Sequence, residues 1–397
     1  MTKLFIEDLD FKGKKVLLRA DFNVPLDGDG NISDTTRIEA TLPSIRYVLD
    51  QGGALILMSH LGRPRGEAHP QLSLAPVATA LSAILETPVT LAANCIGEKV
   101  RDQVDALKPG EVMLLENLRF HRAEEHPEED PDFAKELASY ASCYINDAFG
   151  AAHRKHSSTY TITQYFPRQA AAGYLLENEI RFLGETLSHP SHPFYAIIGG
   201  AKISSKIGVI KALLKKVDRL LIGGGMAYTF LKARGMSIGD SLFENDLVPL
   251  AEQLLKEHGS QIVLPLDFLA ATECSEEAPS KHVSSETGIP QGYQGLDIGP
   301  QTIELFKQTL SDARTVLWNG PLGVYEFEHF AGGTLAIARY LATLRATTIV
   351  GGGDSLAAIK DAEVSDKITH LSTGGGATLE YIEYGTLPGI EALSEKT

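Results

Sequence analysis

Apolar runs of strand length alternate with amphipathic helical stretches along nearly the whole chain, and this alternation limits the folds that it can adopt. Residues 14–19 (KKVLLR) and 54–60 (ALILMSH) have the character of buried strands, and residues 34–50 between them have the apolar spacing of a helix. Strands that alternate with helices in this way run parallel, because each connection crosses over the sheet. The sequence therefore predicts an α/β fold with parallel sheets flanked by helices.

The length of the chain and one helical stretch near its middle predict two domains. At 397 residues the chain exceeds the size at which a single hydrophobic core stops growing, about 250–300 residues. Residues 171–187 form a long helical pattern, and the segment 189–193 (HPSHP) then interrupts the chain. We place the connection between the domains at this stretch, and the alternation of strands and helices restarts after it.

The composition argues against several classes of function. The net charge of −15 disfavours nucleic acid or an acidic membrane as a partner, because proteins that bind these carry a basic face. No apolar run reaches about 18 residues, and the N-terminus lacks the apolar core of a signal peptide. Three cysteines without CxxC spacing indicate reduced thiols, so that we expect a soluble, cytoplasmic protein.

Four glycine clusters follow apolar strand runs in the second half of the chain, at 199–200, 223–225, 351–353 and 374–376. Glycine before a helix lets backbone N–H groups come close to a phosphate, although a single cluster commonly serves only a tight turn. No Walker A sequence and no GxGxxG is present, which disfavours a P-loop NTPase and a standard dinucleotide-binding fold. Four clusters together predict a phosphate-binding platform.

Four charged side chains near these clusters could serve the same ligand. Lys202 and Lys206 are four residues apart, which predicts one shared helix face, turned either to a phosphate or to solvent. Asp354 follows a glycine cluster, where a carboxylate can carry Mg²⁺ beside nucleotide phosphates or can simply cap a helix. Glu326 could accept a hydrogen bond from a ribose hydroxyl.

Arginine and histidine follow the strands of the first half. Arginine binds phosphate or carboxylate with two parallel hydrogen bonds, and grouped arginines in an acidic protein form local positive sites. Asp21 and Asn23 lie on one face of an extended segment, where they could bind a small polar ligand or form an Asx turn. Arg37 lies in the first turn of a predicted helix, whose positive end favours anions. The other candidates are His60, Arg63, Arg119 and Arg154.

Ten sequence blocks, in order along nearly the whole chain, resemble phosphoglycerate kinase. They are RADFNVPL, SHLGRP, LLENLRF, NDAFGAAHR, GGAK, GGGMAYTF, DIGPQT, NGPLGVYE, GGGDS and STGGG. The resemblance implies two Rossmann-like domains, each a parallel sheet flanked by helices, joined by a hinge helix. It implies a phosphoglycerate-binding domain over 1–171, a nucleotide-binding domain over 172–377 that begins with the interdomain helix, and a segment over 378–397 that packs back on the first domain.

The same resemblance assigns roles to residues of this chain by their place in the matching blocks. The substrate, 3-phosphoglycerate or 1,3-bisphosphoglycerate, would bind at Asp21, Asn23, Arg37, His60, Arg63, Arg119 and Arg154. ADP or ATP with Mg²⁺ would bind at Lys206, Glu326, Gly352, Gly353, Asp354 and Ser355, with the metal on Asp354. Arg37 and Lys202 would be the catalytic residues. Ser355 stands where the family usually has threonine, and it keeps the hydroxyl group.

The implied reaction is reversible phosphoryl transfer between 1,3-bisphosphoglycerate and ADP. The acceptor carboxylate is ionised at neutral pH, so that no general base is needed. We expect a monomer whose domains close about a hinge near 171–187, because the two ligands lie on separate domains.

Two alternatives belong to other classes of protein. A dehydrogenase of the NAD type would be expected to have the GxGxxG that is missing here. A catalytically inactive regulator that binds sugar phosphate or nucleotide would be expected to lack Arg37 or Lys202, and both are present.

Overall fold

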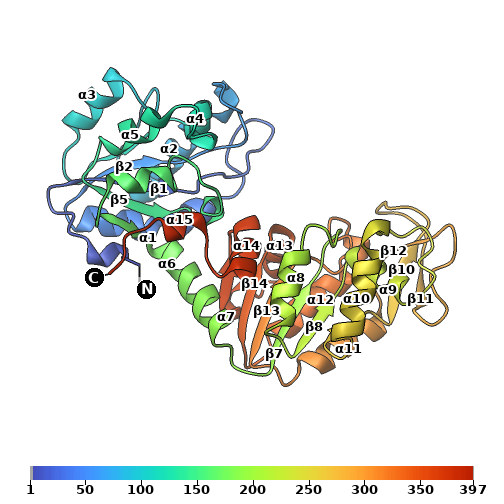
Figure 1. Cartoon of the computed structure of the whole chain (residues 1–397). Coiled ribbons are helices and arrows are strands. Elements are labelled where there is room, and N and C mark those ends of the chain that lie inside the picture. Colours follow the sequence, from blue (N-terminus) through green and yellow to red (C-terminus); the bar gives the residue numbers. More distant parts are fainter. Residues whose placement is uncertain (1–2, 397) are drawn as a thin grey trace. The chain divides into compact units, whose positions relative to one another are not determined.

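The computed structural model describes residues 3–396, and these residues form two compact units (Figure 1). The first unit runs to Arg181 and takes up the chain again from Thr386, and the second unit is Phe182–Gly385. Each unit contains a six-stranded sheet in which all neighbouring strands are parallel. The predicted α/β fold with two parallel sheets flanked by helices is confirmed.

The first unit is built on strands that are buried on both faces. Every residue of 54–58 is buried, as is every residue of 143–147, because helices cover both sides of the sheet. The strands are β1 (Lys15–Ala20), β2 (Ala54–Met58), β3 (Val89–Leu91), β4 (Val112–Leu114), β5 (Cys143–Asp147) and β6 (Ala170–Ala172). The helices are α1 (Thr36–Asp50), α2 (Ala75–Leu85), α3 (Glu98–Ala106), α4 (Arg122–Glu125), α5 (Pro131–Ala138), α6 (Tyr174–Glu179) and α15 (Pro388–Glu391).

The order of these strands, β3-β4-β2-β1-β5-β6, fixes where a ligand can bind. The chain leaves β1 toward β2 on one side and leaves β5 toward β6 on the other. The connections therefore diverge between β1 and β5, and the crevice at their carboxyl ends is the usual ligand site of such a sheet.

The second unit repeats this plan with the order β15-β14-β13-β7-β8-β9, so that the connections diverge between β7 and β13. Its parallel strands are β7 (Phe194–Ile198), β8 (Arg219–Ile222), β9 (Ile262–Val263), β13 (Thr315–Asn319), β14 (Thr347–Gly351) and β15 (His370–Ser372). Its helices are α7 (Thr186–Ser188), α8 (Ile207–Leu214), α9 (Met226–Ala233), α10 (Val248–His258), α11 (Pro300–Leu310), α12 (Gly332–Leu341), α13 (Gly353–Asp361) and α14 (Gly376–Tyr384).

A small antiparallel sheet also belongs to the second unit. Its strands, in the order β11-β10-β12, are β10 (Asp267–Ala271), β11 (Ser280–Ser284) and β12 (Gln294–Ile298). The sequence analysis does not predict this sheet, because β11 has exposed polar residues at 281 and 282 and lacks an apolar run. Residues 271–288 contain β11 and the loops on either side of it, and their sequence indicates no function.

The connecting stretch 171–187 differs in detail from the single helix that its sequence predicts. Residues 170–172 form the edge strand β6, which pairs in parallel with β5. Its three alanines are buried, so this part of the stretch extends the sheet and does not begin the helix. The helical part then consists of α6, a π-helical turn over Ile180–Glu185, and α7. The boundary between the compact units falls inside the π-helical turn.

The chain returns to the first unit later than the sequence analysis expects. The predicted returning segment begins at 378, but α14 packs against α8 of the second unit (Figure 1). From Thr386 onward the chain belongs to the first unit, where Gly389 N–H donates to Ala152 O at 2.8 Å and Ser394 N–H donates to Ala170 O at 3.0 Å.

Candidate active site

The crevice at β1 and β5 in the first unit gathers most of the predicted substrate residues. Asp21 follows β1, and Arg37 lies in the first turn of α1, where its Nη1 donates to Asp21 Oδ2 at 2.5 Å. Burial alone would raise the pKa of Asp21, but the electrostatic effects of His60, Arg37 and Arg19 outweigh it and lower this pKa. Asp21 is thus an ionised group that holds the Arg37 guanidinium at the mouth of the crevice.

The loop after β5 closes in on this pair. Gly150 lies so near that a Cβ atom there would stand 2.5 Å from Asp21 Oδ2 and 3.7 Å from Arg37 Nη1. Only glycine allows this approach without a shift of the ion pair. The same loop carries His153 and Arg154, and Arg154 Nε donates to His153 Nε2 at 3.1 Å.

The loops after β2 and β4 meet at Gly62. The N–H of Gly62 donates to Asn23 Oδ1 at 2.8 Å, and its carbonyl accepts from Arg119 Nη1 at 3.0 Å. Gly62 has φ +63°, the left-handed conformation that glycine adopts easily. Asn23 and Arg119 are therefore held in one assembly, while Arg63, the next residue, has an exposed side chain.

His60 and Arg119 are both buried. His60 is 4% exposed and Arg119 8% exposed, and burial lowers the pKa of each, that of His60 well below its usual value. Arg119 keeps a carboxylate partner, since its Nε lies 3.3 Å from Glu125 Oε1. Asp21 and Arg37 thus form one group, and Asn23 and Arg119 form another. His60 is buried behind them, and Arg63 and Arg154 end in solvent.

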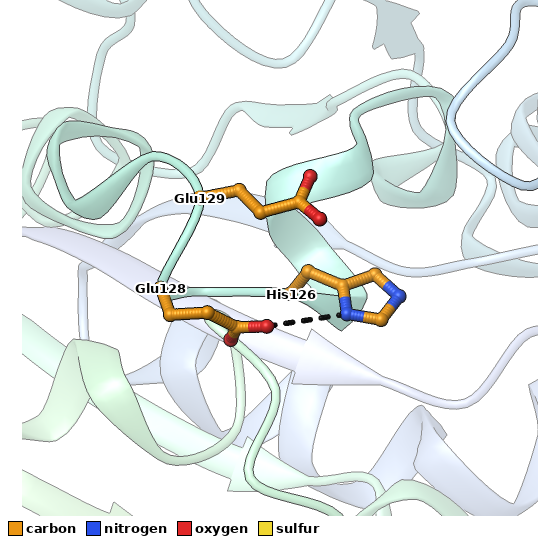
Figure 2. A group of neighbouring side chains, drawn as sticks. All are labelled: His126, Glu128 and Glu129. Carbon is orange, nitrogen blue, oxygen red and sulfur yellow. Dashed lines mark hydrogen bonds and ion pairs between the residues drawn. The ribbon is translucent and has the colours of Figure 1, made fainter.

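An exposed acidic loop beside Arg154 brings His126, Glu128 and Glu129 close together (Figure 2). His126 Nδ1 lies 3.3 Å from Glu128 Oε1, while Glu129 Oε2 accepts from Arg122 Nε at 2.6 Å. A metal ion here would compete with Arg122 for Glu129 and with water at all three exposed side chains. We assign no metal to this loop, which the sequence also leaves without a function.

The crevice at β7 and β13 in the second unit has a different construction. Gly199 N–H donates to Asn319 O and Gly200 N–H donates to Pro321 O, both at 2.9 Å. A Cβ atom on Gly224 would stand 2.6 Å from the Gly200 nitrogen, so the glycines at 199–200 and 223–225 allow main chains to pack together. Gly353 has open space around it instead, as do Gly375 and Gly376. The first two clusters are therefore packed against other main chain, and the last two contain glycines with open space beside them.

Lys206 lies under this crevice and is largely enclosed by oxygen acceptors. Its Nζ donates to Gly199 O at 2.8 Å and to Asn319 Oδ1 at 2.7 Å. Burial lowers its pKa to about 8, against the opposing effect of Asp354. Lys202 lies in a turn before α8, which begins only at Ile207, so the two lysines share no helix face and that prediction is wrong.

A cavity of about 390 Å³ opens in the second unit, and Gly200 is one of its lining residues. Glu326 and Asp354 both line it, and so do three glycines of the first two clusters, Gly200, Gly224 and Gly225. Its other walls are largely apolar and come from Tyr228, Leu242, Leu296, Leu322 and Val324. A flat apolar group with a polar tail fits such walls, as a nucleotide does.

The helix α13 presents its N-terminus at the same end of the sheet. Its N-cap residue is Gly352, so that Asp354 lies in the first turn and is not the cap. Ser355 is buried, and its Oγ accepts from the Gly320 N–H at 2.7 Å. This hydroxyl therefore holds the loop after β13 in place, while Asp354 is exposed.

Several residues of this site are not predicted from the sequence. Asn319 binds Lys206 through its side chain, and its only signal is that it ends the strand run TVLWN. Tyr228, Leu242 and Cys274 line the cavity from distant segments, and no local pattern marks them.

Comparison with known proteins identifies the family of the chain. The family model of phosphoglycerate kinase matches residues 6–384. The chain is 54% identical over 401 residues to a phosphoglycerate kinase of Chlorobaculum tepidum and 53% identical over 399 residues to one of Moorella thermoacetica, in each case over 100% of both chains. It superposes on phosphoglycerate kinase structures from Coxiella burnetii (38% identity) and Pyrococcus horikoshii (32% identity), each with a TM-score of 0.86 and 98% of both chains covered. The chain belongs to the phosphoglycerate kinase family.

Proposed function

We propose that the two crevices divide the work of the family's reaction, with the substrate held in the first unit and the nucleotide in the second. The chain is a kinase of glycolysis that transfers a phosphoryl group reversibly between 1,3-bisphosphoglycerate and ADP, giving 3-phosphoglycerate and ATP. Its acceptor is a carboxyl group. The dehydrogenase alternative is wrong, and nothing favours the inactive regulator.

The observation that carries this division is the contrast between the crevices. The first offers paired arginines, Arg37 on Asp21 and Arg119 on Gly62 O, which suit a small ligand with a carboxylate and a phosphate. The second offers a cavity of about 390 Å³ with apolar walls and acidic groups at its edge, which suits a nucleotide.

Arg37 and Lys202 would neutralise the oxygens of the phosphoryl group in transfer. Arg37 is held by Asp21, so that its charge is already in place when the group arrives. Lys202 is exposed in the turn before α8 and is free of regular structure. His60, Asn23, Arg63, Arg119 and Arg154 would orient the substrate, and Lys206, Glu326, Gly352, Gly353 and Ser355 would serve or support the nucleotide.

Asp354 would hold Mg²⁺. It is an exposed carboxylate on the cavity wall, in the first turn of α13, and Mg²⁺ typically takes one or two carboxylates besides nucleotide phosphates. The bound ion would supply neutralisation of the phosphate charge.

Transfer requires the units to close, because each holds only part of the charge that stabilises the phosphoryl group. We place the hinge in the π-helical turn Ile180–Glu185, where the boundary between the units falls. Small-angle scattering should give a smaller radius of gyration with 3-phosphoglycerate plus nucleotide than with either alone. An equal radius of gyration with either ligand alone and with both would contradict closure about this turn.

The setting of the enzyme is also a proposal. Among residues 3–396 no helix has the length and apolarity needed to span a bilayer. The three cysteines are free thiols, with Cys95 and Cys143 buried and Cys274 exposed. We propose a cytoplasmic monomer that does not bind nucleic acid.

A coupled assay tests the function directly. Purified protein with ATP, Mg²⁺ and 3-phosphoglycerate should consume ATP only when all three are present, and Lys202→Ala should abolish most of the turnover. Lys211→Ala, a change of the same kind on an exposed face of α8, is the matched control. Turnover without 3-phosphoglycerate, or none at all with every component, would contradict the proposal.

A further inference from the structure

A chain of buried polar groups runs behind the substrate crevice of the first unit. It consists of Arg19 in β1, His60 after β2, Glu124 in α4 and Ser158, and all but His60 are fully buried. Arg19 Nε donates to Ser158 Oγ at 2.8 Å, and this hydroxyl donates to Glu124 Oε1 at 2.6 Å. On its other side Arg19 Nη2 lies 3.1 Å from His60 Nδ1.

The chemistry of arginine decides the direction of the last contact. A guanidinium group has only donors, so His60 Nδ1 must accept with its lone pair. A neutral imidazole that accepts at Nδ1 carries its proton on Nε2. Since burial keeps the pKa of His60 well below its usual value, the neutral form prevails near pH 7. The Nε2–H group of His60 is therefore a donor of fixed identity.

Glu124 provides the charge that lets a guanidinium lie in this buried position. A buried charge without a counter-charge is costly, and Glu124 Oε1 lies 3.8 Å from Arg19 Nη2. Burial raises the pKa of Glu124, and Arg19 and the hydrogen bonds from Ser158 oppose this effect. Because the Ser158 hydroxyl accepts from Arg19, its proton points to Glu124 Oε1, while Oε2 accepts from the Ser158 N–H at 3.0 Å, and both oxygens act as acceptors. Ser157 Oγ further ties α4 in place by donating to Ala123 O at 2.6 Å.

We propose that Glu124 is a positioning residue of the phosphoglycerate site, which with Ser158 holds Arg19 so that Arg19 fixes His60 as the Nε2–H tautomer. Glu124 is fully buried and acts only through its neighbours. The inference rests on the proposed function, because the substrate-binding role of His60 is part of that proposal. Its consequence is that His60 meets the anionic substrate as a neutral donor whose orientation is set before binding.

Nitrogen NMR of the free enzyme tests the tautomer without any ligand. Protein with ¹⁵N-labelled histidine, and His60→Gln to assign the signal, should show His60 with a bare Nδ1 and a protonated Nε2 from about pH 6 to 8. A protonated Nδ1 in the wild type would overturn the proposal at once.

Glu124→Gln then tests whether Glu124 fixes the tautomer of His60. This change keeps the size of the side chain and its acceptor oxygen but removes the charge, so His60 should show a mixture of tautomers or a new titration. Ser158→Ala removes the bridging hydroxyl and should have the same effect, which covers a failure of Glu124→Gln to fold. Glu128→Gln is the matched control, an exposed glutamate in the loop that follows α4. An unchanged His60 spectrum in folded Glu124→Gln or Ser158→Ala would overturn the proposal.

Binding separates a positioning role from a merely structural one. Calorimetry should give a Kd for 3-phosphoglycerate raised about tenfold or more in Glu124→Gln, with the Kd for ADP unchanged. A shifted tautomer with unaltered 3-phosphoglycerate binding would contradict the positioning role. If the wild type itself fails to bind 3-phosphoglycerate, the proposed function fails, while the NMR result still decides the network.

Discussion

The two crevices are furnished with opposite kinds of polar group. In the first unit the positive groups are side chains already engaged with protein partners, as Arg37 is with Asp21 and Arg119 with Glu125. In the second unit main-chain groups predominate, and the one enclosed cation, Lys206 among the residues described, is bound by main-chain and amide oxygens. Under the proposed function, the small substrate would meet charges that are already in place, and the longer nucleotide would meet mainly main-chain groups.

This difference teaches where each site is sensitive to change. A preset charge fails when its side chain is removed, because no other group can take the same place. A main-chain surface fails when its geometry is disturbed, while removal of one side chain costs less. The two kinds of site therefore predict different responses to substitution.

The strongest test of the comparison is Arg37→Ala. Loss of one preorganised donor to a transition state typically costs about 10²–10³ in rate, so turnover should fall by that factor with the fold intact. Steady-state kinetics with circular dichroism measure both. Arg46→Ala, an exposed arginine on the same helix α1, should retain full activity. A loss below tenfold for Arg37→Ala would mean that its charge is not preset for the reaction.

The glycines of the second unit offer a test of geometry. A Cβ atom on Gly199 would stand 2.6 Å from Gly320 O, so Gly199→Ala should lower the free energy of unfolding by about 1–3 kcal/mol. Gly353 has nothing within 4 Å, and Gly353→Ala should leave stability unchanged or raise it by up to about 1 kcal/mol. Urea unfolding compares them. Equal destabilisation by both would erase the distinction between packing and accessible glycines.

The sequence predicts the strands and the ends where ligands bind, because buried parallel strands have an apolar pattern of their own and end in glycine or in charged residues. It does not predict Asn319 or the apolar wall of Tyr228 and Leu242, since these meet only through the tertiary fold. The roles given to Arg63 and Lys202 come from the family resemblance. Both side chains are exposed, and no local sequence pattern distinguishes them from other surface residues.

Two wrong predictions have one physical cause. Four-residue spacing suggests a shared helix face for Lys202 and Lys206, and apolar periodicity assigns residue 171 to a helix. The actual starts of α8 and α6 depend on how the preceding loop and β6 pack, and a local pattern contains no such information.

A smaller effect is expected for Asp354→Asn. If this carboxylate carries Mg²⁺, the mutant should need several-fold more Mg²⁺ for half its maximal rate, while the free energy of unfolding changes by less than about 0.5 kcal/mol. A titration of rate against Mg²⁺ measures the shift. Asp366→Asn, an exposed aspartate outside the cavity, is the control. An unchanged dependence of the rate on Mg²⁺ would show that Asp354 does not bind the ion.

A last test concerns Lys206 and pH. Its folded pKa is about 8 against 10.5 in the unfolded chain, so the unfolded state binds more protons between these values. The free energy of unfolding of the wild type should therefore rise from about pH 8 to about pH 10.5 relative to Lys206→Met. Urea unfolding at several pH values gives both curves. Parallel curves would mean that Lys206 is well solvated, and that the second crevice has no enclosed cation.

The return of the chain at Thr386 has a consequence for biosynthesis. The first unit uses both ends of the polypeptide, as in the main-chain hydrogen bond from Leu4 N–H to Ser394 O at 2.8 Å. A ribosome makes Thr386 and the residues after it only when the whole of Phe182–Gly385 has been made. The second unit is continuous and can fold while translation proceeds, whereas the first must wait for these later residues to gain its final contacts. The half that is translated first is the half that is finished last.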